Sequence, residues 1–228
     1  MPEIQQDIEP LVAGDKLTWE EFEARWDAMP ELEHAELIGG VVYIMSPVTE
    51  IHGQTCMDIS TLLRLYALDT PGCQGSCGAT WRMLGDAPQP DAYLRILEEY
   101  GGKSHVEGKY AMGAAELIVE VCHSSAAYDL HQKKELYHRA GVDEYLAILL
   151  REREVRWHRW GRKDYVVVPV PPDGIMCSRV FPGLWLNVQA LLQDDMARVL
   201  ETLRQGLKST DHTAFVQTLA RRRAGEKT

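Results

Sequence analysis

A nearly uninterrupted apolar run at residues 117–122 constrains the fold more than any other feature of this sequence. It reads Leu-Ile-Val-Glu-Val-Cys. Six residues suit a strand, and a strand with apolar residues at consecutive positions is covered on both of its faces. The run therefore predicts a central strand between two layers of structure, and its only charged residue is Glu120.

The carboxylate of Glu120 needs a partner in such a strand. A buried, unpaired carboxylate is costly or shifts its pKa, so a base, a proton or a metal ion must neutralise it. A second acid, Asp91, begins another predicted strand after the turn at Gln89-Pro90. Two carboxylates on neighbouring strand ends are the ligands that a hard cation such as Mg²⁺ prefers, and they indicate a metal site.

The remaining pattern mixes helices and strands. Thr18-Trp19-Glu20-Glu21 is a capping box that starts a short helix, and Gly39-Gly40 predicts the turn of a hairpin within 36–45. Further helices are expected at 51–69, 126–140, 187–206 and 211–223, strands at 77–84, 91–97, 145–150, 155–160 and 165–170, and a loop at the polar, glycine-rich segment 98–112. This order favours an α/β chain, with an α+β mixed sheet flanked by helices.

Charge is concentrated at the start of the chain. The net charge is −10, and residues 1–36 contain 11 acids and two bases, so the rest is nearly neutral. This balance argues against nucleic-acid binding by bulk attraction but leaves room for a local basic groove. Since no run of about 18 apolar residues and no secretory signal is present, we expect a cytoplasmic protein with no membrane partner.

The five cysteines are scattered and are expected to be free thiols. Cys73 and Cys77 lie four residues apart, but no second pair follows them, which disfavours a zinc site. The basic stretch at 151–163, which overlaps a predicted hairpin, is the strongest candidate for contact with nucleic acid, because arginines bind phosphates and tryptophans stack on bases. Acidic residues alternate with the basic ones there, and charge on a hairpin also blocks edge pairing, so both interpretations are open. The residues concerned are Arg151, Arg153, Arg156, Arg159, Arg162 and Lys163 with Trp157 and Trp160.

Several motifs, in this order, resemble the Uma-two family, a bacterial family of restriction-endonuclease-like proteins in the PD-(D/E)XK nuclease superfamily. The resemblance covers about residues 17–186 and implies a restriction-endonuclease-like core. We expect an acidic flexible lead at 1–16 before this nuclease-like domain and extra C-terminal helices at 187–228. The motifs are the hairpin that ends in Ser46-Pro47, His52 at a helix start, Gln89-Pro90-Asp91, Ile118-Val119-Glu120-Val121, Tyr128-Asp129 with Lys133 and Tyr137, and Gly141-Val142 with Glu144-Tyr145.

The resemblance assigns roles to particular residues. Asp91 matches the metal-binding aspartate, Glu120 the acid of the (D/E)XK motif, and Glu36 an acid that serves as a further metal ligand. The superfamily lysine would fall at Cys122, and Lys133 matches the helix lysine that the family uses instead. The predicted catalytic residues are therefore Asp91, Glu120 and Lys133, and the predicted metal ligands are Asp91, Glu120 and Glu36.

Structural roles without any catalytic or metal-binding function are also open for these residues. Lys133 lies four residues after Asp129, a spacing that also suits a surface ion pair, and Glu36 also suits a solvated acid. His52 is expected either near the site or as a helix cap or packing group, and Tyr137 is expected in the core.

The resemblance implies a DNA endonuclease that hydrolyses phosphodiester bonds with Mg²⁺ or Mn²⁺ as its cofactor. DNA is the expected partner, and a homodimer would suit cleavage of both strands. Two departures favour an alternative, a catalytically inactive nuclease-fold module that binds DNA or a protein. These are Cys122 in place of lysine and Leu149 where family members often carry an aspartate.

Overall fold

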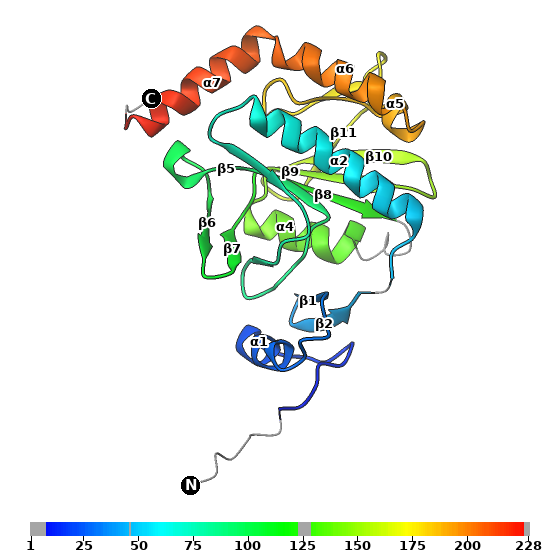
Figure 1. Cartoon of the computed structure of the whole chain (residues 1–228), viewed down its shortest axis with the longest axis vertical. Helices are drawn as coiled ribbons and strands as arrows, with labels where there is room; N and C mark the ends of the chain where they lie inside the picture. The colour runs from blue at the N-terminus through cyan, green and yellow to red at the C-terminus, as the bar shows by residue number, and fades with distance from the viewer. Residues whose placement is uncertain (1–7, 46, 123–128, 226–228) are drawn as a thin grey trace.

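The fold is built around a six-stranded mixed sheet with the order β11-β10-β9-β8-β5-β3 (Figure 1). The computed structural model describes residues 8–45, 47–122 and 129–225. Strand β8 is parallel to β9 and antiparallel to β5, so the apolar run has a hydrogen-bonded neighbour on each side, as the sequence predicts. The strands are β3 (Cys73–Ser76), β5 (Ala92–Ile96), β8 (Leu117–Cys122), β9 (Glu144–Leu149), β10 (Glu154–Arg159) and β11 (Val166–Val168).

Helices cover both faces of this sheet (Figure 1). Alternate residues of β8 contact different layers, because side chains of a strand point to opposite faces. Leu117, Val119 and Val121 pack in a core with α2 and the C-terminal helices, whereas Ile118 and Cys122 pack in another with α4. The helices are α2 (Glu50–Leu68), α4 (Lys134–Ala140), which follows a π-helical turn (Asp129–Lys133), and α5 (Val188–Leu192), α6 (Met196–Leu207) and α7 (Thr210–Arg223). The predicted class, a mixed sheet flanked by helices with further C-terminal helices, is confirmed.

A third, smaller core joins α1 (Trp19–Asp27) to the hairpin of β1 (Ala35–Ile38) and β2 (Val41–Ile44). The predicted capping box is present, with the Thr18 side chain accepting from the amide of Glu21. Part of the predicted acidic lead also lies against the hairpin: the amide of Gly14 donates to the carbonyl of Val42.

The prediction of a loop at 98–112 is wrong. A short 3₁₀ turn (Glu98–Tyr100) is followed by β6 (Ser104–Glu107) and β7 (Tyr110–Gly113), and β7 also pairs in parallel with β4 (Trp81–Arg82). Most residues of β6 are exposed, which is why the composition of this segment is polar. The pairing of β7 with β4 is a tertiary contact that local composition does not reveal.

Three other boundaries differ from the prediction. The predicted strand at 77–84 is replaced by β3 before it and the two residues of β4 within it. The predicted helix at 187–206 is broken between α5 and α6, where Asp194 has a φ of +60° and the Asp195 side chain caps α6. A hairpin of β12 (Ile175–Cys177) and β13 (Trp185–Asn187) was not predicted. The first residues of the predicted helix at 126–140 lie outside the described residues.

None of the helices described is both long and apolar enough to cross a bilayer.

Candidate functional site

Asp91 and Glu120 lie on adjacent strands of the main sheet. Ala92 of β5 pairs with Val119 of β8, so Asp91, the residue before β5, lies opposite Glu120 in the same antiparallel register. The backbone amide of Val121, which follows Glu120, donates to Asp91 Oδ2 at 2.7 Å. This bond fixes the Asp91 carboxylate beside β8, and the two predicted acids are therefore neighbours.

The helix after β8 supplies two donors to Glu120. Lys133 Nζ lies 3.1 Å from Glu120 Oε1, and the Tyr137 hydroxyl donates to the same oxygen at 2.6 Å. Lys133 ends the π-helical turn and Tyr137 is four residues later in α4, a spacing that places both side chains on one face. Lys133 is only 1% exposed, so the prediction of a surface ion pair is wrong, and the side chain of Asp129 lies outside the described part.

Glu36 belongs to the same buried group. Its side chain is fully buried, and its Oε1 lies 2.8 Å from Lys133 Nζ and accepts from the amide of Gln89 at 2.6 Å. The interpretation of Glu36 as a solvated acid is therefore wrong. Lys133 bridges an acid of the β1–β2 hairpin and an acid of the central strand, which ties the hairpin to the main sheet.

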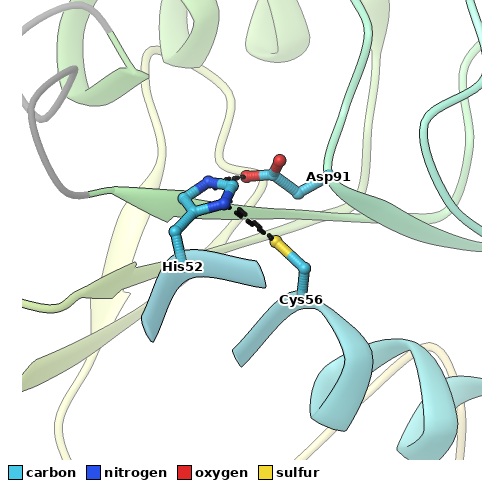
Figure 2. A group of neighbouring side chains, drawn as sticks. All are labelled: His52, Cys56 and Asp91. Carbon is cyan, nitrogen blue, oxygen red and sulfur yellow. Dashed lines mark hydrogen bonds and ion pairs between the residues drawn. The ribbon is translucent and has the colours of Figure 1, made fainter. Parts of the chain in front are cut away.

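His52 and Cys56, four residues apart on α2, approach Asp91 from another side (Figure 2). His52 Nε2 lies 3.6 Å from Asp91 Oδ2, and His52 Nδ1 lies 3.5 Å from Cys56 Sγ. The sequence left the place of His52 open and predicted Cys56 only as a free thiol. The signal that would have found the pair is its spacing on a predicted helix, because residues i and i+4 share a face.

The side chains whose possible metal-ligand atoms lie closest together are not the three predicted ligands. Across residues 8–45, 47–122 and 129–225, His52, Cys56 and Asp91 form the one group of three such residues whose donor atoms lie within 4.8 Å of one another. Asp91, Glu120 and Glu36 do not form a group of this kind. The structure instead joins Glu36 to Glu120 through Lys133, and it joins Asp91 to the amide beside Glu120.

The surroundings set the charge of these groups. Burial raises the pKa of Asp91, but the contact with His52, the amide of Val121 and the charge of Lys133 outweigh it, so the pKa lies below its ordinary value. Asp91 is therefore ionised at neutral pH. Burial, together with the nearby carboxylates, raises the pKa of Tyr137 well above its ordinary value, so its hydroxyl remains a donor to Glu120.

A pocket of about 670 Å³ opens beside Asp91 and Cys56. Its wall combines residues of α2 with the segment 31–34 that precedes β1, and it includes the acidic residues Glu31 and Glu33. This space gives a ligand access to Asp91, and the acids on its wall favour cations over anions.

The basic hairpin of β10 and β11 exposes only one of the two tryptophans that were predicted to stack on bases, Trp160, which is 48% exposed. The Trp157 ring is 1% exposed, so the prediction that it stacks on bases is wrong. The Trp160 ring already stacks on His138, with centroids 5.5 Å apart, and Arg156 pairs with Glu154 of its own strand. Contact between DNA and the other basic residues of this hairpin stays a prediction.

Comparisons with known proteins agree with this fold. A crystal structure of a protein from Anabaena variabilis, described as a "putative nuclease belonging to DUF820", has a TM-score of 0.61 and 14% identity, over 78% of this chain and 98% of that one. At this identity the likeness shows a shared fold. The search of curated proteins gave no match. The family model described as "Uma2: Putative restriction endonuclease" matches residues 19–189. Because this match spans more than half of the sequence, the chain belongs to the Uma2 family.

Proposed function

We propose that the protein is a metal-dependent DNA endonuclease that hydrolyses phosphodiester bonds, with Asp91, Glu120 and Lys133 as its catalytic residues. The observation that carries the proposal is the bond from the Val121 amide to Asp91, which holds this carboxylate beside Glu120 of β8, together with a buried lysine bonded to Glu120. The family is described as a "putative restriction endonuclease" and the similar structure as a "putative nuclease", and both descriptions support the same class of reaction.

The donor set fits Mg²⁺ or Mn²⁺. Carboxylate oxygens are the ligands that these ions prefer, and the amide of Val121 holds the Asp91 carboxylate next to Glu120. When bound, such an ion polarises a phosphoryl oxygen and lowers the pKa of water. Glu36 Oε1 is bonded to Lys133 and to the amide of Gln89, so we assign Glu36 to holding the lysine, and its part as a metal ligand stays a prediction.

The chain's own residues would prepare the site for phosphate. Tyr137 and Lys133 fix the orientation of Glu120 through two bonds to one oxygen. The ammonium group of Lys133 would offset negative charge that grows on the phosphate in the transition state, a form of electrostatic stabilisation that a preorganised, buried group supplies well.

Cleavage assays with matched variants test the proposal. We expect the purified protein to cut duplex or single-stranded DNA in Mg²⁺ or Mn²⁺ and to lose that activity on Glu120→Gln or Asp91→Asn substitution. Glu154→Gln is the matched control, because Glu154 is an exposed acid that pairs only locally with Arg156. Circular dichroism would verify that each variant folds. Failure of the wild-type protein to cut any DNA form, or full activity of the Glu120 variant, would refute the proposal.

Two buried residues favour a second candidate function, a nuclease-fold module that binds DNA without cutting it. Cys122 and Leu149 pair in register across β8 and β9 and are almost completely buried in the apolar core beside the site. Neither supplies the charged group that the superfamily or the family carries there. Fluorescence anisotropy with labelled DNA distinguishes the candidates: binding without cleavage in Mg²⁺ or Mn²⁺ would favour the module.

A further inference from the structure

We propose that His52, Cys56 and Asp91 form a second metal site, one that binds a thiophilic divalent cation of the zinc class. The three side chains come from α2 and from the start of β5, and they point toward one another (Figure 2). The proposal does not rest on nuclease activity, although the site shares Asp91 with the proposed catalytic residues.

The distances suit a tetrahedral ion. Zinc bonds of about 2.3 Å to sulfur and about 2.0–2.2 Å to nitrogen and oxygen imply, at tetrahedral angles, separations of about 3.6 Å between N and S and about 3.4 Å between N and O. His52 Nε2 lies 3.9 Å from Cys56 Sγ and 3.6 Å from Asp91 Oδ2. Both distances exceed the ideal by a few tenths of an ångström, so small side-chain rotations would complete the ligand geometry.

The kinds of donor atom decide which cation the site selects. Imidazole nitrogen and thiolate sulfur favour zinc and similar ions, whereas Mg²⁺ prefers oxygen ligands alone. Cys56 and Asp91 both line the 670 Å³ pocket, so a fourth position on the ion would be open to solvent or to a ligand. Three protein ligands with one open position are the arrangement of catalytic and exchangeable zinc sites rather than of closed structural ones.

Helix α2 makes the site rigid on one side. His52 and Cys56 are one helical turn apart, and the helix continues to Leu68 with its inner face packed in the main core. Two ligands are thus held in place before the ion arrives, and the amide of Val121 holds the third, Asp91. A cation bound here would take Asp91 from the proposed magnesium site, so the two kinds of ion would compete.

Cobalt spectroscopy tests the site without reference to DNA. Co²⁺ replaces zinc in such sites, and a thiolate bound to Co²⁺ absorbs in the near ultraviolet through charge transfer. We expect one equivalent of Co²⁺ to produce this band, Zn²⁺ to abolish it at stoichiometric amounts, and millimolar Mg²⁺ to be a far weaker competitor. The Cys56→Ser variant should lose the band, and His52→Asn should weaken Co²⁺ binding.

Cys177→Ser is the matched control, because Cys177 is an exposed thiol in β12, whereas Cys56 is a half-buried thiol of α2. The band should survive this substitution. Absence of the band in the wild-type protein, its persistence in the Cys56 variant, or its loss in the Cys177 variant would overturn the proposal. DNA cleavage is measured on the same preparations. A cobalt band without DNA cleavage would mean that the proposed nuclease function has failed, and DNA cleavage without a cobalt band would mean that the proposed zinc-class site has failed.

Discussion

Replacing Lys133 with methionine should reveal how much stability the buried charges carry. Methionine is close to lysine in length and volume, so the substitution removes the ammonium group and leaves little empty space. The carboxylates of Glu36 and Glu120, 0% and 2% exposed, then lose the cation that lies 2.8 Å and 3.1 Å from them. Two like charges would face one another in a medium that solvates them poorly.

The size of the effect follows from this burial. Removal of one partner from a buried ion pair costs about 3–5 kcal/mol, because the remaining charge is left uncompensated. That is a large share of the roughly 5–15 kcal/mol by which a domain is stable. With a urea dependence of about 3 kcal/mol per molar, the midpoint of unfolding should fall by about 1–1.7 M.

Urea unfolding followed by circular dichroism measures this shift, and the next residue is its control. Lys134 lies 3.6 Å from Asp164, with side chains 24% and 64% exposed, and such exposed pairs contribute at most about 1 kcal/mol. Lys134→Met should therefore move the midpoint little. Adding Glu36→Gln to Lys133→Met should recover part of the loss. Equal effects of the two methionine variants, or no recovery in the double variant, would refute the reasoning.

Two further substitutions test the bonds around the acids. Tyr137→Phe removes a 2.6 Å bond to Glu120 and should lower the free energy of unfolding by about 1.5–3 kcal/mol, the usual range for a hydrogen bond to a charged group; a urea midpoint equal to that of the wild type would contradict this. The pKa of Asp91 is lowered in the folded state. The ionised carboxylate therefore stabilises the protein at pH values above about 3.9, the pKa of an aspartate in the unfolded chain, and this stabilisation disappears as the pH falls through the lower pKa of the folded state. Asp91→Asn should therefore cost more stability at about pH 7 than at about pH 3, and an equal cost at both values, measured by urea unfolding, would show that the charge of Asp91 contributes nothing.

Local patterns sufficed for the elements whose stability is local or strongly periodic. The capping box at Thr18, the two-glycine turn of the β1–β2 hairpin, the amphipathic helix α2 and the apolar strand β8 all appear where the sequence predicts them. Elements that depend on distant pairing were missed. The β6–β7 hairpin is polar by composition and gains its place from pairing with β4, some thirty residues earlier in the chain.

The candidate site shows the same division. Asp91 and Glu120 could be predicted because an acid inside an apolar strand needs a partner, and the family resemblance added Lys133 and Glu36. The contacts themselves could not be predicted. Tertiary register places Lys133 between two buried acids and bonds the Val121 amide to Asp91. Cys56 was missed although its spacing of four residues from His52 on a predicted helix is visible in the sequence.

The position of the lysine follows from the packing around β8. Residues two apart in a strand share a face, so Glu120 and Cys122 point to the layer of α4. A lysine at 122 could reach the site from the strand itself, but Cys122 is fully buried beside Leu149. The π-helical turn delivers Lys133 to that same face from the covering layer, and its ammonium group meets Glu120 at 3.1 Å. Although position 122 holds no lysine, the Glu120 carboxylate therefore has a buried ammonium partner, and this partner supplies the positive charge that the proposed phosphodiester hydrolysis would require.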